Sequence, residues 1–177
     1  MGGATMDANR FKHLARQLKL MAFDVDGVMT DGSLYYGAEG EAFKVFNTLD
    51  GHGLKRLAAS GVTLAIITGR NSPMVARRAA DLGITQVIQG REDKGIALAA
   101  LAAELGMDAD VCGYMGDDEP DVSALTWAAL AFAVPNAHTS VKAVACHVTT
   151  AYGGKGAVRE VCDLLLAARR KSAGDEA

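Results

Sequence analysis

Acidic side chains cluster in the stretch FDVDGVMTDG, residues 23–32, which follows a short apolar run. Asp24 and Asp26 come directly after residues 20–23, where a buried strand is expected and unpaired carboxylates are normally avoided. Because side chains alternate along an extended segment, the two carboxylates can face the same way, and a cation or a proton then relieves their repulsion. The stretch predicts a metal site, a catalytic pair or a solvated turn.

Other polar groups follow the later apolar runs. Thr68-Gly69-Arg70 follows the second run, Lys94 opens a helix after the third, and Gly116-Asp117-Asp118-Glu119-Pro120-Asp121 follows the fourth. In open α/β sheets, ligands bind beyond the carboxyl ends of the strands, so we expect these groups to meet. Thr68 and Gly69 suit anion binding, and Lys94 supplies a compact positive charge. Asp117 adds a third carboxylate for a hard, oxygen-bound cation such as Mg²⁺.

Each of these groups also has a structural explanation. A Thr-Gly pair is often a turn, Lys94 alone could be a solvated helix residue, and acidic residues after Gly116 could cap a helix. An EF-hand loop is excluded, because Gly27 occupies loop position 4 rather than 6 and Val28 stands where an acidic ligand is required. The order of carboxylate pair, Thr, Lys and carboxylate pair, each at a strand end, favours one composite site.

The elements that must position these groups alternate between strand and helix. Apolar runs of strand length cover residues 20–23, 62–67, 86–88, 111–115 and 130–134, and helical patterns cover residues 53–59, 73–82, 94–105, 122–128 and 157–168. The glycines expected at helix ends are Gly61, Gly83 and Gly106. This alternation predicts a doubly wound, Rossmann-like α/β fold with a parallel sheet. We expect residues 1–177 to form one domain, with an N-terminal helix in 1–19 and a C-terminal tail and helix in 150–177.

One segment, residues 33–47, departs from the alternation and predicts a β-hairpin. Two apolar stretches, 33–36 and 41–47, flank the turn sequence Gly37-Ala38-Glu39-Gly40. Apolar residues occupy both alternating faces, and a two-stranded hairpin cannot bury both. Either another subunit covers one face or the hairpin folds back on its own domain.

The composition excludes several classes of protein. The net charge is −3 and there is no basic tract, so nucleic-acid binding is not expected. No apolar run reaches the roughly 20 residues of a membrane span. The first twenty residues predict an amphipathic helix rather than a secretory signal. Three cysteines, Cys112, Cys146 and Cys162, lack any C-x-x-C spacing, which indicates reduced core residues and a cytoplasmic location.

The motifs D-V-D-G-V, T-G-R, Lys94 and G-D-D-E-P-D resemble the four motifs of the haloacid dehalogenase (HAD) superfamily of phosphotransferases. The gaps between them leave no room for a cap domain, so the chain resembles the capless subgroup, with the hairpin as a flap. D-V-D-G-V-M-T-D-G, F-N-T-L-D-G-H-G and G-G-K-G-A-V-R-E-V-C-D-L-L-L are similar to the 3-deoxy-D-manno-octulosonate 8-phosphate (KDO 8-phosphate) phosphatases. That family implies homotetramers in which the hairpin and C-terminal tail of neighbouring subunits complete each active site.

The resemblance implies a role for each motif residue. Asp24 would attack phosphorus and form an aspartyl-phosphate, and Asp26 would act as the acid and then the base. Thr68 and Lys94 would hold the phosphoryl oxygens. Mg²⁺ would be bound by the Asp24 carboxylate, the Asp26 backbone carbonyl and Asp117. The implied reaction releases phosphate from KDO 8-phosphate.

The resemblance also implies a set of substrate-binding residues. These are Asp26, Asn47, Thr48, Leu49, Asp50, Gly51, Lys55, Gly69, Arg70, Arg78 and Lys94, with residues 47–51 expected in a loop after the hairpin. The family usually has Val-Arg where Thr48-Leu49 stands, and often Arg where Lys55 stands, which weakens the expected grip on a carboxylate. Four further residues are assigned supporting roles, Asp118 and Asp121 beside Lys94 and the metal, and Lys155 and Arg159 in a tail that approaches a neighbouring site.

Three alternatives accompany this interpretation. The substrate could be a nine-carbon sugar acid 9-phosphate, for which residues 47–55, Arg70 and Arg78 would discriminate. The chain could be a non-catalytic HAD-like assembly domain, although all the catalytic residues are retained. A response-regulator receiver domain is excluded, because its phospho-accepting aspartate follows the third strand and the acidic pair here follows the first.

Overall fold

The computed structural model describes residues 6–170 and has a parallel sheet with the strand order β5-β4-β1-β6-β7-β8. The strands are β1 (Leu20–Phe23), β4 (Thr63–Ile67), β5 (Gln86–Ile88), β6 (Cys112–Gly116), β7 (Leu130–Ala133) and β8 (His147–Val148). The central strand β1 pairs in parallel with both β4 and β6, and all four of its side chains are fully buried. A strand covered on both faces is apolar throughout rather than alternating, which explains its sequence LMAF.

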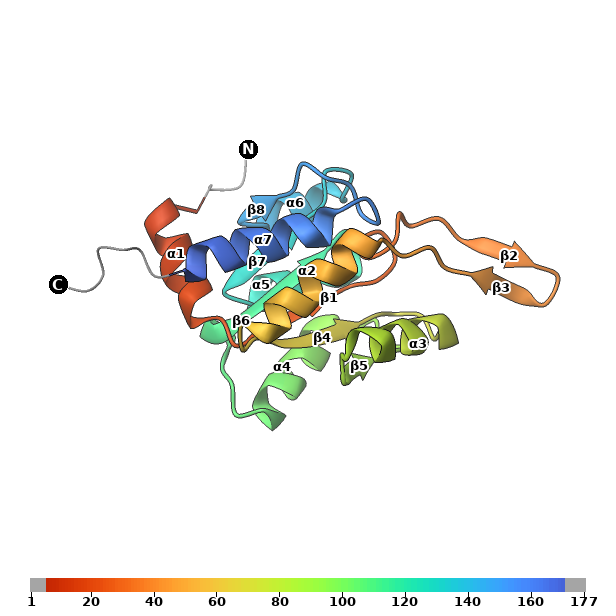
Figure 1. Ribbon diagram of the computed structural model, residues 1–177, viewed down its shortest axis with the longest axis horizontal. Helices are drawn as coiled ribbons and strands as arrows, with labels where there is room; N and C mark the ends of the chain where they lie inside the picture. The colour runs from red at the N-terminus through yellow and green to blue at the C-terminus, as the bar shows by residue number, and fades with distance from the viewer. Residues whose placement is uncertain (1–5, 171–177) are drawn as a thin grey trace.

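The helices lie on both faces of the sheet (Figure 1). They are α1 (Ala8–Gln17), α2 (Thr48–Ala59), α3 (Pro73–Leu82), α4 (Lys94–Glu104), α5 (Val122–Trp127), α6 (Thr139–Val144) and α7 (Ala157–Arg169), with short 3₁₀ turns η1 (Ala109–Val111) and η2 (Glu119–Asp121). Helices α2 and α7 lie side by side on one face, and α4 packs against α5 on the other. The predicted doubly wound α/β fold is confirmed, and no segment of residues 6–170 forms a cap domain.

The strand order places a topological switch point beside β1. The chain proceeds outward from β1 to β4 and β5, then crosses back to β6 on the other side of β1. Loops leaving β1 and β6 therefore diverge at this point and open a crevice, where ligands bind in such sheets. Asp24 follows β1 and Asp117 follows β6, so the fold brings the two acidic motifs to the same crevice.

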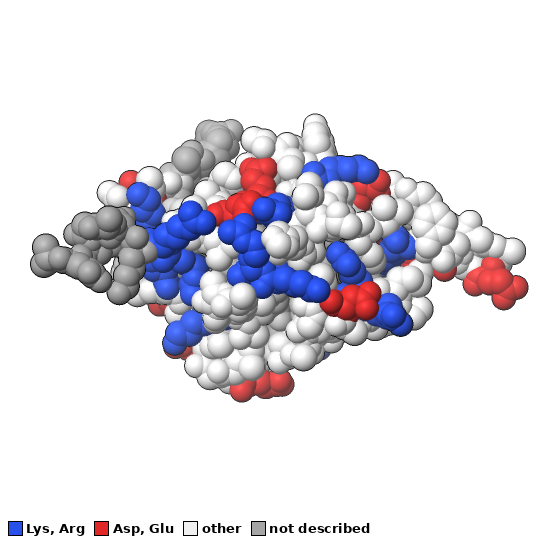
Figure 2. Space-filling model, in the orientation of Figure 1, with Lys and Arg blue, Asp and Glu red and all other residues white. Residues whose placement is uncertain are grey.

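The hairpin projects from the end of the domain that carries the strand carboxyl ends (Figure 1). Its strands β2 (Tyr35–Gly37) and β3 (Gly40–Phe43) are shorter than the predicted 33–36 and 41–47. The exposed fractions of Leu34, Tyr36, Phe43 and Val45 are 44%, 63%, 51% and 47%. These apolar side chains are therefore not covered by their own domain. Most of the hairpin surface is uncharged, with acidic atoms near its tip (Figure 2).

Three further elements differ from the sequence-based prediction. Helix α2 begins at Thr48 rather than residue 53, because Asn47 caps it and Asn47 Oδ1 accepts a hydrogen bond from Leu49 N at 2.8 Å. Residues 48–51 are thus the first turn of a helix and not a loop. Helix α6 and strand β8 were not predicted, because their short segments carry little periodic signal. In the predicted terminal segments, residues 1–5 and 171–177 lie outside the described part of the chain.

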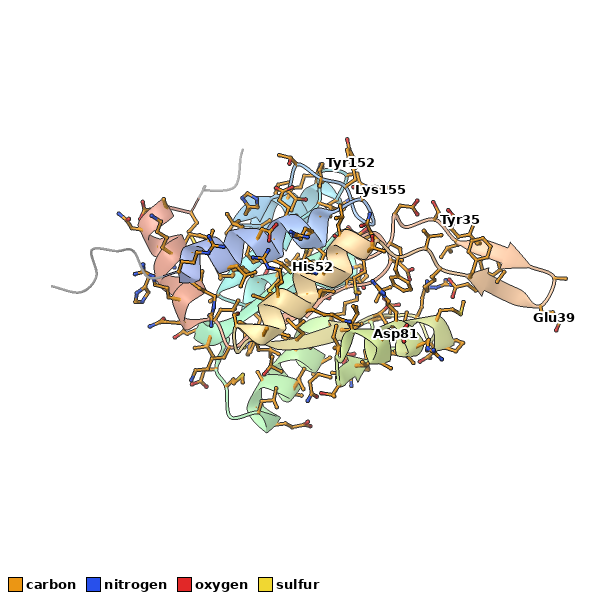
Figure 3. All side chains as sticks on the ribbon, in the orientation of Figure 1. Tyr35, Glu39, His52, Asp81, Tyr152 and Lys155 are labelled. Atoms are coloured by element: carbon orange, nitrogen blue, oxygen red, sulfur yellow. The ribbon has the colours of Figure 1, made fainter. Side chains whose placement is uncertain are left out.

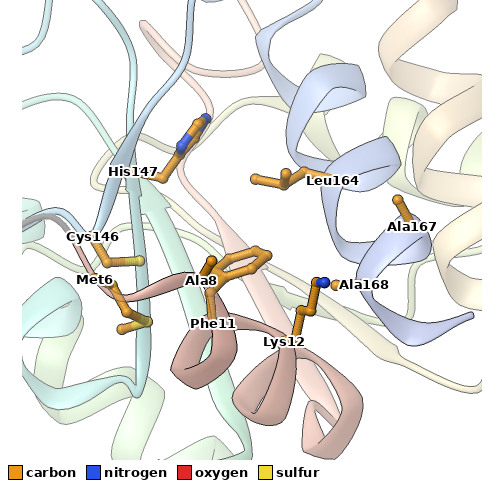
Figure 4. A pocket seen from close by; sticks show the side chains of 9 residues that line it. All are labelled: Met6, Ala8, Phe11, Lys12, Cys146, His147, Leu164, Ala167 and Ala168. Carbon is orange, nitrogen blue, oxygen red and sulfur yellow. The ribbon is translucent and has the colours of Figure 1, made fainter. Parts of the chain in front are cut away.

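The cysteines and the α1 region contribute none of the predicted site residues. Cys112 and Cys162 are buried, Cys146 is partly exposed, and all three are free thiols. An apolar cavity of about 360 Å³ lies between α1, α7 and β8 and is lined by Phe11, Leu164 and other residues, none of them a predicted site residue (Figure 4). Across residues 6–170, no helix combines the length and apolar character needed to cross a membrane.

Candidate active site

Asp24 and Lys94 form the buried floor of the site. Asp24 follows β1, and Lys94 is the first residue of α4, which follows β5. The carboxyl ends of these two strands bring the two side chains together. Lys94 Nζ lies 2.9 Å from Asp24 Oδ1 and 2.7 Å from Asp121 Oδ1, and the exposed fraction of each of the three side chains is 7% or less. Charged groups are buried this deeply only when paired, so the contact fixes the Asp24 carboxylate and the Lys94 ammonium group relative to each other.

Asp121 lies at the base of this cluster and contacts Lys94. Its Oδ1 accepts hydrogen bonds from Lys94 Nζ at 2.7 Å and Tyr114 Oη at 2.8 Å. Its Oδ2 accepts from the backbone N–H groups of Asp117 at 2.9 Å and Asp118 at 3.1 Å. A carboxylate offers about four lone-pair positions, and all are in use. The contact with Lys94 agrees with the orienting role expected for Asp121.

Asp24, Asp117 and Asp121 each present a carboxylate oxygen within 4.8 Å of the others. Because the oxygens of Asp121 are already occupied by donors, Asp24 and Asp117 are the two carboxylates free to hold a cation. Gly27 has a φ of +88°, and a Cβ there would collide with the Asp117 carboxylate, so glycine permits this close approach. An all-oxygen donor set of this kind fits Mg²⁺.

The electrostatics of the cluster also fit a missing positive charge. Burial raises the pKa of Asp24 well above its usual range, Asp121 adds to the rise, and Lys94 opposes it. Burial and the charge of Asp121 raise the pKa of Asp117 to about 7. Burial lowers the pKa of Lys94, but attraction to Asp24 and Asp121 outweighs it and the pKa is raised. One ammonium group thus serves three carboxylates, and a divalent cation would complete the charge balance.

A polar cavity of about 270 Å³ opens above this floor. It brings together the predicted catalytic and metal residues, and it is lined by Asp24, Asp26, Gly32, Thr68, Gly69, Arg70, Glu92, Lys94, Asp117, Asp118 and Pro120. Thr68 follows β4 and is 2% exposed, so its hydroxyl group is held at the cavity wall. A buried hydroxyl and an ammonium group can donate hydrogen bonds to the oxygens of a phosphoryl group, and two carboxylates lie beside them.

Asp26 faces the hairpin rather than the floor. Its Oδ1 accepts a hydrogen bond from Lys44 Nζ at 2.6 Å, and its Oδ2 lies 3.7 Å from Arg70 Nε. Arg70 also donates from Nη2 to Tyr36 Oη at 3.2 Å and lies 3.7 Å from Glu41 Oε1. Lys44 and Glu41 are not among the predicted site residues, because no local pattern shows which charges of a hairpin turn toward the domain.

The predicted substrate-binding residues separate into three groups. Gly69, Arg70 and Lys94 line the polar cavity, whereas Arg78 lines a neighbouring cavity of about 360 Å³ that also includes Lys44 and Phe46. The Arg78 guanidinium lies 5.8 Å from the centroid of the Phe46 ring, and its Nη2 donates to Asn47 O at 3.3 Å.

The first turn and the outer face of α2 carry the remaining members. Thr48, Leu49 and Lys55 are exposed, and Gly51 packs closely against Arg78. Asp50 is 3% exposed, and its Oδ1 accepts from Arg159 N at 2.9 Å, so it holds the start of α7. Contact of these five residues and Asn47 with substrate stays a prediction.

The segment before α7 packs on the loop that follows β1 and carries Asp24 and Asp26. Gly154 N donates to Val28 O at 3.1 Å, and Asn47 Nδ2 donates to Gly154 O at 3.2 Å. Figure 3 shows Tyr152 and Lys155 near the end of the domain from which the hairpin projects. Arg159 Nε pairs with Asp163 Oδ2 at 2.7 Å within α7. The predicted approach of Lys155 or Arg159 to a neighbouring site stays a prediction.

Comparison with known proteins identifies relatives of this chain. Residues 83–160 match a family model described as haloacid dehalogenase-like hydrolase. The chain is 44% identical over 160 residues to the 3-deoxy-D-manno-octulosonate 8-phosphate phosphatase KdsC of Yersinia pestis, a match covering 90% of this chain and 86% of that protein.

Solved structures show the same likeness. The 3-deoxy-D-manno-octulosonate 8-phosphate phosphatase of Moraxella catarrhalis, in complex with magnesium, phosphate and KDO, has a TM-score of 0.89 and 47% identity, covering 92% of this chain and 94% of that chain. The cobalt-bound phosphatase of Haemophilus influenzae has a TM-score of 0.87 and 40% identity, covering 93% and 96%. The chain therefore belongs to the 3-deoxy-D-manno-octulosonate 8-phosphate phosphatase family of haloacid dehalogenase-like hydrolases.

Proposed function

We propose that this protein is a Mg²⁺-dependent phosphatase that hydrolyses KDO 8-phosphate to KDO and phosphate. The observation that carries the proposal is the buried Asp24–Lys94–Asp121 cluster beside Asp117, at the switch point of the sheet. The relatives named for this activity, and the one solved with magnesium, phosphate and KDO, support the choice of substrate and metal.

The chain's own residues account for both halves of the reaction. A carboxylate oxygen of Asp24 forms a bond to phosphorus, the bond from phosphorus to the sugar oxygen breaks, and that oxygen takes a proton from Asp26. Water then attacks the aspartyl-phosphate, gives its proton to Asp26, and releases inorganic phosphate and the Asp24 carboxylate. Thr68 and Lys94 hold the phosphoryl oxygens as their charge builds up.

Asp24, Asp117 and the backbone carbonyl of Asp26 would hold Mg²⁺. When bound, the ion supplies positive charge that offsets repulsion between the Asp24 carboxylate and the phosphate dianion. Asp121 keeps Lys94 directed at Asp24 throughout, since its own oxygens are fully occupied by protein donors.

A homotetramer is part of the proposal. Four apolar hairpin side chains, Leu34, Tyr36, Phe43 and Val45, are each at least 44% exposed. Exposed apolar side chains gathered on one hairpin favour burial against another subunit, and Tyr36 contacts Arg70 at the wall of the polar cavity. A neighbouring hairpin could therefore complete the sugar-binding side of the site. The three free thiols favour a cytoplasmic location.

A nine-carbon sugar acid 9-phosphate is the second candidate substrate. Residues 48–49 and Lys55 carry neither guanidinium group expected at these positions, and they lie on the exposed side of α2. The comparison that separates the two substrates is kcat/KM for the eight-carbon and the nine-carbon ester with the same enzyme preparation. A higher value for the nine-carbon ester would replace the substrate proposed here.

The central test uses purified protein, Mg²⁺ and KDO 8-phosphate, with release of inorganic phosphate as the readout. We expect turnover by the wild-type protein and a loss of about 10⁴-fold in Asp24→Asn, because the amide is not a nucleophile. Asp31→Asn is the matched control, since Asp31 caps the exposed turn at Ser33 and should retain activity. Normal turnover by Asp24→Asn, or turnover insensitive to EDTA, would contradict the assignment.

A further inference from the structure

Lys44 is a buried lysine in the segment that returns from the hairpin to the domain. Its neighbours Phe43 and Val45 are about half exposed, yet the side chain of Lys44 is only 2% exposed. Lysine is rarely buried to this extent unless its ammonium group is paired, because removal of a charge from water is costly. The burial therefore points to partners strong enough to hold it.

Two carboxylates hold the Lys44 ammonium group. Nζ donates to Asp26 Oδ1 at 2.6 Å and lies 2.8 Å from Glu41 Oε1. Asp26 belongs to the segment after β1, whereas Glu41 belongs to β3 of the hairpin. Lys44 consequently joins the hairpin to the segment that carries the proposed acid and base. The second oxygen of Asp26, Oδ2, faces Arg70, with 3.7 Å between it and Arg70 Nε.

Lys44 is separated from the place where the phosphoryl group would bind. The polar cavity is lined by Asp26 and Arg70 but not by Lys44, which lines the adjoining cavity with Phe46 and Arg78. Direct contact between Lys44 and the transferred phosphoryl group does not fit this arrangement. Lys44 instead contacts the Asp26 carboxylate and can fix its direction. That direction matters because Asp26 is the proposed proton donor, and a proton donor must lie within hydrogen-bond reach of the leaving oxygen.

We infer that Lys44 is a positioning residue for leaving-group departure, which holds Asp26 Oδ1 so that Oδ2 faces the ester oxygen of the substrate. The inference rests on the proposed phosphatase function. Because Lys44 and Glu41 both belong to the hairpin segment, the direction of the acid is coupled to the placement of the hairpin. A lysine that only stabilised the hairpin would affect all phosphate esters alike.

The test compares two esters that differ in their need for a proton. An alkyl phosphate such as KDO 8-phosphate requires protonation of the leaving oxygen, whereas p-nitrophenyl phosphate releases a stable anion without it. The quantity measured is kcat/KM, which covers steps up to departure of the leaving group. In Lys44→Met we expect a loss of about 10- to 100-fold for the alkyl ester and less than about 3-fold for the aryl ester.

Further variants distinguish positioning from loss of fold. Lys44→Arg keeps a cation and should recover part of the alkyl-ester activity. Glu41→Gln keeps Lys44 on Asp26 and should show a smaller loss with the same preference between esters. Lys19→Met is the control, since Lys19 is exposed between α1 and β1. Circular dichroism and Tm establish that each variant is folded.

The outcomes separate this inference from the proposed function. Equal losses for both esters, or no loss for either, in folded Lys44→Met would overturn the positioning role while wild-type activity upheld the phosphatase. If Lys44→Met does not fold, an equal loss for both esters in Glu41→Gln has the same consequence. A wild-type protein that hydrolyses neither ester would overturn the proposed function, and the role of Lys44 with it.

Discussion

The floor of the site and the hairpin beside it are built in opposite ways. Asp24, Lys94 and Asp121 are at most 7% exposed and are held by strands and helices of one domain. The hairpin exposes about half of several apolar side chains, and its charged residues Lys44 and Glu41 contact Asp26 and Arg70 of the site. From this difference we expect changes in the floor to affect phosphoryl transfer, and changes in the hairpin to affect binding of the sugar.

The largest effect should come from the floor. Lys94→Met removes the cation shared by Asp24 and Asp121, and we expect kcat to fall by about 10³-fold in steady-state assays with Mg²⁺. Unpaired buried carboxylates also destabilise the fold, so Tm should fall as well. Lys19→Met serves again as the control. An Lys94→Met protein with unchanged kcat would mean that the floor does not carry the chemistry.

Removal of Mg²⁺ tests the floor of the site through the charge of the Asp117 carboxylate. The pKa of Asp117 in the folded, metal-free protein is about 7, above the ordinary value of 3.8 expected in the unfolded chain. Protonated Asp117 therefore stabilises the folded protein. This contribution is fully present below pH about 4 and is lost as the pH rises through about 7. Mg²⁺ replaces the proton, so the rise in Tm on adding Mg²⁺ should be larger at pH 8 than at pH 5.5.

Scanning calorimetry with Mg²⁺ or with EDTA at the two pH values measures this difference. In Asp117→Asn the pH dependence of the Mg²⁺ effect should become smaller, because one of the two carboxylates with a raised pKa is gone. An identical shift in Tm at both pH values in the wild-type protein would contradict the assignment of Asp117 as a metal ligand.

A change on the hairpin should affect assembly more than chemistry. The double variant Leu34→Ser, Val45→Ser removes exposed apolar surface at two residues that do not line the polar cavity. We expect light scattering to show dissociation, KM for KDO 8-phosphate to rise about 10-fold, and kcat for p-nitrophenyl phosphate to change less than about 3-fold. Glu39→Gln at the hairpin tip is the control. A wild-type protein that is a monomer and fully active would contradict the expectation that the hairpin acts through assembly.

The smallest effect is expected at the border between the regions. Arg70 donates to Tyr36 Oη at 3.2 Å and faces Asp26 and Glu41 at 3.7 Å. Arg70→Lys keeps the charge but loses the planar fork that suits a carboxylate, so KM should rise by about 3- to 10-fold with kcat nearly unchanged. A fall in kcat with constant KM would assign Arg70 to the floor instead.

Much of the floor was predictable from the sequence, because strand ends in a parallel sheet converge by geometry. The apolar runs predicted the strands, and the polar residues directly after them predicted which side chains would meet. The surroundings of Asp50 were not predictable in this way. It was expected in a loop facing substrate, whereas it lies in the first turn of α2 and its carboxylate holds the start of α7.

The sequence by itself determined the order of the elements and the residues that gather at the switch point. Only the tertiary structure decided that Asp121 is saturated by four donors, that Lys44 holds Asp26, and that the hairpin leaves its apolar surface uncovered. The physical reason is one of range. Periodicity and strand ends are local properties of the chain, whereas the partner of a buried charge is chosen among residues that become neighbours only after folding.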